Sequence, residues 1–306
     1  MALLRLAGPG REDPAYVRLT GVPGPLPKLA VIGHVEWVQF ARVGHVPSAG
    51  EVVHAADPFE EPAGGGAVAA VQLARLAGGC TLFTALGDDE LGRRSVTRLE
   101  ELGVTVRASI RDAPTRRALT LLDEDGERTI TTFGGRLDPR GEDDLGWDEL
   151  HGSDGLYFTA GDTAALALAR RATRVLTASP RARGALGHGI GLEALILSGE
   201  DQIELDGAGA AEGESELVVY TEGERGGHFR SRSGQEGRWS AAALAGPLAD
   251  SYGCGDSFAA GLTYGLAARL ELDRALELAG SCGAACLSSP GPYGRPAGLP
   301  TGSPDS

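Results

Sequence analysis

Short apolar runs alternate with helix-like segments through the second half of the chain, and this alternation limits the folds open to it. The runs carry few charges, which suits strands buried on both faces. A helix is predicted over residues 163–171 and a polar surface loop over 208–215. Such alternation predicts a mainly parallel sheet with helices on both faces. The predicted buried strands are residues 29–32, 81–86, 156–159, 175–177, 194–197 and 217–221.

The stretch from Asp250 to Phe258 places two glycines directly before an apolar helix. Glycine permits positive φ and close approach of a ligand, and the unpaired amides of a helix start suit a bound phosphate. Asp256 lies in this helix start, where it can take a proton from a hydroxyl that attacks phosphorus. The simpler interpretation is a glycine turn with Asp256 as helix cap. Cys254 is predicted to be either a thiol with a lowered pKa or a small spacer.

Composition narrows the partners and the chemistry. The 306-residue chain has a net charge of −14, which disfavours nucleic acid and anionic membranes as partners. It contains no apolar run near the ~18 residues that cross a bilayer and no secretory start, so we expect a cytoplasmic protein with reduced cysteines. Lys28 is the only lysine, which excludes a P-loop enzyme.

The segment Asp-Ser-Tyr-Gly-Cys-Gly-Asp-Ser-Phe resembles the C-terminal signature of the ribokinase-like carbohydrate kinases, the PfkB family, which has the pattern Asp-Thr-x-Gly-Ala-Gly-Asp-x-Phe. Ser251 and Cys254 are the departures, each a small residue for a small one. The resemblance implies that ATP with Mg²⁺ donates its γ-phosphate to a hydroxyl of a sugar or sugar-like molecule. It makes Asp256 the general base, and the amides of Gly253, Cys254 and Gly255 the donors to the phosphoryl oxygens.

Motifs nearer the N-terminus follow in that family's order. Gly64 and Gly65 open an alanine-rich helix, which resembles the N-terminal signature, but Val68 stands where an Asn is expected. The family also carries an Asn and an Asp after its first strand, which hold sugar hydroxyls. Here those positions are Glu36 and Val38. The resemblance therefore places Glu36, Gly64 and Gly65 at the acceptor, with altered recognition.

Four further strands are predicted to form a small sheet, and the resemblance makes this sheet a lid over the sugar site. The second pair is a hairpin around Glu124-Asp125-Gly126, a good turn sequence. Arg116 and Arg117 lie at its base as either surface charge or a clamp on an anionic substrate, with Arg117 taken as substrate-binding. The predicted lid strands are residues 34–40 and 51–54, both half-exposed, and residues 118–122 and 128–132.

The remaining assignments also rest on the resemblance. Thr221 and Gly223 end a strand at the place where the family borders its nucleotide. Asp201 and Glu204 are spaced like a motif that organises magnesium-bound water and phosphate, although a solvated helix start explains them equally well. Asp250 is assigned to a monovalent-cation site, such as one for K⁺.

The expected organisation is a single three-layer, ribokinase-like α/β domain over residues 29–295, with lid strands at about 34–56 and 115–133. An N-terminal arm of residues 1–28 and a C-terminal tail of 296–306 flank it, and two copies are expected to pair through the lid.

Two alternatives stay open at this stage. The apolar residues Val38 and Val68 are compatible with a non-catalytic ligand-binding relative, against which the retained Asp256 argues. A nucleoside kinase is the other alternative, because Trp37, Val38 and Phe40 would form an apolar wall suited to a base.

Overall fold

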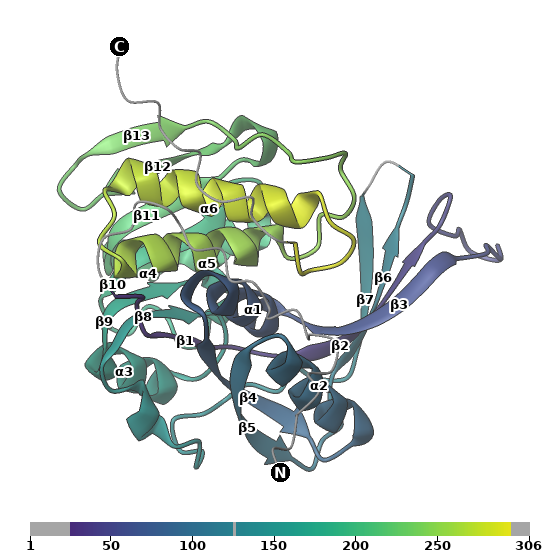
Figure 1. Cartoon of the computed structure of the whole chain (residues 1–306), viewed down its shortest axis with the longest axis horizontal. Coiled ribbons are helices and arrows are strands. Elements are labelled where there is room, and N and C mark those ends of the chain that lie inside the picture. Colours follow the sequence, from purple (N-terminus) through teal and green to yellow (C-terminus); the bar gives the residue numbers. More distant parts are fainter. Residues whose placement is uncertain (1–24, 125–126, 295–306) are drawn as a thin grey trace, which may run out of the picture.

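The computed structural model describes residues 25–124 and 127–294, which form two sheets of unequal size (Figure 1). The predicted arm and tail lie almost wholly outside the described residues. The strands are β1 (Leu29–Ile32), β2 (Glu36–Arg42), β3 (Ala56–Ala63), β4 (Cys80–Gly87), β5 (Val104–Arg111), β6 (Arg117–Leu122), β7 (Arg128–Phe133), β8 (Ser153–Phe158), β9 (Thr173–Ala178), β10 (Leu192–Ser198), β11 (Ser215–Thr221), β12 (Gly227–Ser231) and β13 (Glu236–Trp239). The helices are α1 (Gly65–Ala77), α2 (Glu90–Glu101), α3 (Thr163–Ala172), α4 (Gln202–Gly213), α5 (Cys254–Ala267) and α6 (Leu272–Leu287), with 3-10 turns η1 (Trp147–Leu150), η2 (Pro180–Ala182) and η3 (Gly223–Arg225).

The larger sheet has the strand order β13-β12-β11-β10-β9-β8-β1-β4-β5. The seven strands from β11 to β5 are parallel, and only β12 and β13 run antiparallel to their neighbours. The predicted mainly parallel sheet is therefore confirmed, and each of its predicted strands is present. Parallel strands bring their carboxyl ends to one edge, which is where ligands bind in open α/β sheets.

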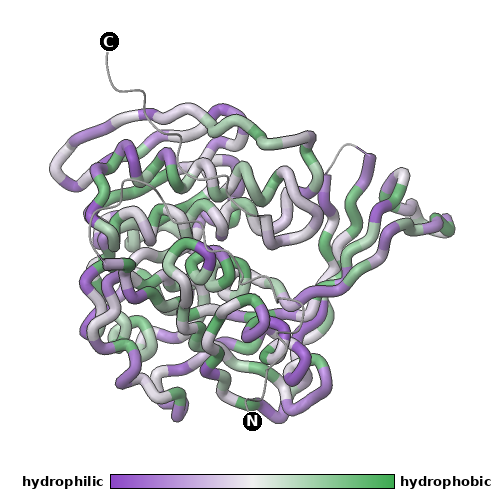
Figure 2. Tube along the Cα trace, in the orientation of Figure 1, coloured by the Kyte–Doolittle hydropathy of each residue, from purple (hydrophilic) through white to green (hydrophobic). Residues whose placement is uncertain are grey.

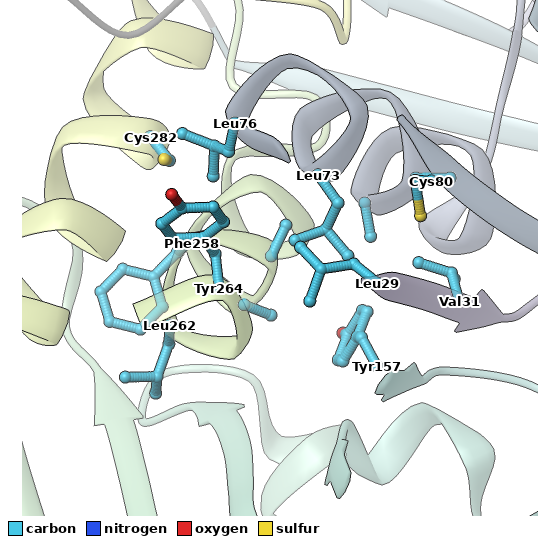
Figure 3. Packing of buried hydrophobic residues seen from close by; sticks show 14 of the residues in the cluster. Leu29, Val31, Leu73, Leu76, Cys80, Tyr157, Phe258, Leu262, Tyr264 and Cys282 are labelled. Atoms are coloured by element: carbon cyan, nitrogen blue, oxygen red, sulfur yellow. The ribbon is translucent and has the colours of Figure 1, made fainter. Parts of the chain in front are cut away.

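Helices cover both faces of this sheet, which gives the predicted three layers. Successive residues of a strand point to opposite faces. In β1, Leu29 and Val31 join a core with α1, α2, α5 and α6, whereas Ala30 and Ile32 join a core with α3 and α4. Figure 3 shows the first core, where Tyr157 of β8 points toward the same side as Leu29. Burial on both faces explains why the strands are almost wholly apolar.

The predicted small second sheet is present and projects from one side of the body (Figure 1); its role as a lid stays a prediction. Its strand order is β3-β2-β6-β7, with β2 and β6 parallel and the outer pairs antiparallel. The predicted hairpin is confirmed as β6 and β7, although residues 125 and 126 of its turn lie outside the described residues. Pairing of two copies through the lid stays a prediction.

Three predicted details of the elements are wrong. Strand β2 is buried along most of its length instead of half-exposed, because it is a central strand with both faces covered. Residues 51–54 form no strand, since Glu51 folds back on Ser48 through both its amide and its carboxylate, and the strand begins at Ala56. Residues 208–213 belong to α4, where Ala208 and Ala211 are buried.

Hydropathy follows this arrangement. Figure 2 shows hydrophobic residues along the helices and strands of the body and hydrophilic residues along much of β3 in the lid. Within residues 25–124 and 127–294, no helix has the length and apolarity needed to cross a membrane.

Candidate active site

Asp256 lies where three elements that are distant in the sequence meet. It belongs to the first turn of α5, and the preceding Gly253 has a φ of 79°, the left-handed conformation that favours glycine. At the start of α1, Gly65 approaches so closely that a Cβ there would lie 2.8 Å from Asp256 Oδ1. From β8, the Tyr157 hydroxyl donates a 3.3 Å hydrogen bond to the same oxygen. The carboxylate is thus fixed at the carboxyl edge of the sheet.

The pKa of Asp256 is raised from 3.8 to about 6. Burial is the largest cause; the neighbouring Glu204 also raises this pKa, while Arg181 and the Tyr157 hydrogen bond lower it. Asp256 is therefore ionised at neutral pH and a stronger base than an ordinary aspartate, as a general base requires. Tyr157 was not predicted as a site residue, because one tyrosine in a buried strand carries no motif.

Arg181 in η2 holds both carboxylates that the sequence linked to magnesium. Its Nε donates to Glu204 Oε1 at 2.6 Å, and its Nη2 donates to Asp201 Oδ2 at 2.7 Å. Asp201 also caps α4, as the simpler interpretation expected. Glu204 is instead buried and accepts the amide of Ser198, so it is not part of a solvated helix start. In the described part of the chain, no group of three or more His, Cys, Asp or Glu residues forms a cluster suited to a metal ion.

Glu36, predicted to bind the acceptor, is buried and already has partners in the protein. Its Oε2 lies 3.2 Å from Arg116 Nε, and its Oε1 accepts a 3.0 Å hydrogen bond from the Tyr252 hydroxyl. The same hydroxyl accepts a 3.1 Å hydrogen bond from the amide of Gly64, another predicted acceptor residue. Tyr252 occupies the unspecified position of the signature, so no motif points to it.

The two arginines at the base of the hairpin separate, because successive residues of a strand point to opposite faces. Arg116 is the one that reaches Glu36. Arg117, the predicted substrate-binding residue, is exposed and lies over the ring of Phe133 at 5.5 Å. The structure therefore places Arg116 among the predicted acceptor residues and Arg117 away from them.

The predicted apolar wall of the acceptor site is also divided by strand alternation. Val38 and Phe40 share one face of β2 and pack in a small core with Val68 and Tyr252. Trp37 lies on the other face, where its indole donates to Glu60 and Arg94 stacks over its ring. The wall of Trp37, Val38 and Phe40 does not exist, and the polar groups expected at positions 38 and 68 are replaced by packed side chains.

Asp250 and Cys254 have roles within the turn itself. The carboxylate of Asp250 is buried and accepts the amides of Tyr252 at 2.8 Å and Gly291 at 3.0 Å, which ties the turn to the segment that follows α6. Burial raises the pKa of Asp250. Burial also raises the pKa of the Cys254 thiol, which is opposite to the predicted activation by the helix start and favours the small-spacer interpretation.

Thr221 and Gly223, the predicted nucleotide-binding residues, lie at the end of β11. Gly223 opens η3 with a φ of 56°, and Glu222 between them is tied to His228 and Arg238. Because β8 and β11 run parallel in one sheet, this loop lies at the same edge as Asp256.

Comparisons with known proteins agree with this geometry. The sequence pattern of the pfkB family carbohydrate kinases matches residues 26–180 and 192–297. An ATP-dependent ribose-1-phosphate kinase of Halopiger xanaduensis is 28% identical over 285 residues, which cover 86% of this chain and 93% of that protein. A ribokinase of Dictyostelium discoideum is 29% identical over 119 residues, which cover 38% of this chain and only 37% of that protein.

The fold is similar to that of solved kinases. An Arabidopsis thaliana ribokinase complexed with ribose and ATP has a TM-score of 0.68 at 19% identity, with 87% of this chain and 94% of that chain covered. Because the family pattern matches well over half of the residues and follows the motifs in order, the chain belongs to the pfkB family of carbohydrate kinases.

Proposed function

We propose that this protein transfers the γ-phosphate of ATP to a hydroxyl of a sugar or sugar-like acceptor, with Asp256 as the general base. Membership of a carbohydrate kinase family supports the reaction, and a relative that covers most of the chain is named as an ATP-dependent sugar-phosphate kinase. The observation that carries the assignment is the Asp256 carboxylate, held beside a glycine turn with a pKa near 6.

In the proposed reaction, the acceptor hydroxyl attacks the γ-phosphorus while its proton passes to Asp256. Tyr157 keeps the carboxylate oriented through its hydrogen bond to Oδ1. Gly253 is the N-cap of α5, and Cys254 and Gly255 begin its first turn. Amides at these positions have no carbonyl partner within the helix, so they can donate to the phosphoryl oxygens. Thr221 and Gly223 border the nucleotide at the same sheet edge.

Magnesium, when bound with ATP, would neutralise charge on the phosphate oxygens. Carboxylate oxygens are suitable ligands for it, and Asp201 and Glu204 are the candidates, acting through water. Because Arg181 already pairs with both, we expect the phosphates and water to supply most of its ligands. The carboxylate of Asp250 already holds the turn, and a K⁺ site at this residue stays a prediction. A cytoplasmic location of the protein also stays a prediction.

The direct test is a screen of acceptors with ATP and Mg²⁺, including ribose, ribose 1-phosphate, hexoses and nucleosides. ADP and phosphorylated acceptor are expected in equal amounts, and chelation of Mg²⁺ should abolish both. Binding of acceptor and nucleotide without any transfer would instead support the non-catalytic relative that Val38 and Val68 left open. The nucleoside alternative has lost its main argument, because Trp37 lies on the other face of β2.

A further inference from the structure

Tyr252 leaves the signature turn and enters the space between the turn and the lid. Its side chain is 6% exposed, and its ring packs edge-on against Phe40 with centroids 5.1 Å apart. Val38 and Val68 belong to the same small core. The backbone is fixed on both sides, because the Tyr252 amide donates to Asp250 and its carbonyl accepts from the Cys286 thiol. The position of this ring is therefore built into the fold.

The phenol hydroxyl uses the polar groups that an acceptor would need. It donates to Glu36 Oε1 at 3.0 Å and accepts from the Gly64 amide at 3.1 Å. Gly65, the next residue, lies so close to Asp256 that an added Cβ would be 2.8 Å from its Oδ1. Tyr252 and the proposed base therefore lie beside adjacent residues of one glycine run, so acceptor atoms bound at Asp256 would have the phenol as a near neighbour.

Displacing the phenol has a calculable effect on binding. Acceptor hydroxyls can replace its two hydrogen bonds, but the ring would lose its burial against Val38, Phe40 and Val68. Loss of that burial weakens binding by a factor of ~10 to 100. An acceptor that stays clear of the phenol avoids this loss.

We propose that Tyr252 sets the size of the acceptor, an inference that rests on the proposed kinase function. The phenol fills the lid-side part of the acceptor pocket, between Glu36 and Gly64. A short open-chain polyol reaches Asp256 with the phenol in place, whereas a ring-closed sugar must displace it. Tyr252 is thus a specificity-determining residue, which discriminates against larger acceptors.

The test compares ribose with glycerol in the wild-type protein and in Tyr252→Ser, which removes the ring. Affinities are measured by calorimetry with a non-hydrolysable ATP analogue and Mg²⁺, and kcat/KM is measured with ATP. We expect Tyr252→Ser to raise the ribose-to-glycerol ratio by ~10- to 100-fold in both measurements, with affinity for the analogue unchanged. Tyr252→Phe, the matched control, keeps the ring and should move the ratio much less.

An equal ribose-to-glycerol ratio in the wild type and Tyr252→Ser would overturn the proposal. If Tyr252→Ser does not fold, Tyr252→Leu keeps an apolar side chain against Val38 and Val68, and the same direction of change is expected from it. If no variant transfers phosphate but the ratio of binding affinities still rises in Tyr252→Ser, the size role stands and the proposed kinase function fails.

Discussion

The Tyr157→Phe substitution isolates the one hydrogen bond that orients the proposed base. The hydroxyl donates to Asp256 Oδ1 at 3.3 Å and so favours the ionised carboxylate. Phenylalanine keeps the ring in the core of Figure 3 and removes only the hydroxyl. A general base must be ionised to accept a proton, so activity is present above its pKa and is lost as the pH falls through it. For the wild type we expect this loss near pH 6, the pKa of Asp256.

The size of the shift follows from the strength of the bond. A hydrogen bond to a charged group contributes about 1.5–3 kcal/mol, and one pKa unit corresponds to about 1.4 kcal/mol. Because 3.3 Å is long for a bond between two oxygens, the lower half of that range applies. Removal of the donor should raise the pKa of Asp256 by roughly 1–1.6 units, which moves the loss of activity to about pH 7 or slightly above.

The assay is kcat/KM against pH for the preferred acceptor, between pH 5 and 9. Tyr264→Phe is the matched control: it lies in the same helix as Asp256, and its buried hydroxyl has no hydrogen-bond partner among the described residues. An unmoved profile in Tyr157→Phe, or an equal shift in Tyr264→Phe, would refute the role of this hydrogen bond.

Two other variants and one labelling experiment also test the site. Gly65→Ala places a Cβ 2.8 Å from Asp256 Oδ1, so kcat should fall by ~10². The control Gly79→Ala adds its Cβ to open space and should keep the wild-type rate. Equal rates in the two variants would show that the close approach of Gly65 is not needed. Asp256→Asn should be more stable than the wild type by at most about 3 kcal/mol above pH 7. The raised pKa means that the wild type loses stability as the pH rises from 3.8 to about 6, so the difference should vanish below pH 4 in denaturant titrations. Iodoacetamide labelling mapped by mass spectrometry should show Cys254 reacting more slowly than an ordinary exposed cysteine, because burial raises the pKa of its thiol.

Local sequence patterns were enough to predict the body of the fold. Buried strands such as β1 are apolar on both faces, and glycine turns such as that at Gly253 mark helix starts, so each leaves a signal within a few residues. The errors came where tertiary contacts override the local signal. Residues 208–213 look like a polar loop because Gly and Glu interrupt them, yet burial of Ala208 and Ala211 stabilises a helix there.

The candidate site was predicted only as far as its motifs extend. Asp256 and the glycines are carried by the signature, whereas Arg181, Arg116 and Tyr252 act through partners far along the chain. The contact between Tyr252 and Glu36 joins residues 216 positions apart, and no pattern in the sequence records it. The choice of Arg117 over Arg116 shows the same limit, since only the register of β6 decides which side chain reaches the site.

The central claim is that Asp256 accepts the proton of the attacking hydroxyl, and Asp256→Asn tests it most directly. The amide keeps the size of the side chain and cannot take the proton. Turnover should fall by ~10²–10⁴, while affinity for an ATP analogue with Mg²⁺, measured by calorimetry, stays close to that of the wild type. Near wild-type turnover in Asp256→Asn would contradict the account.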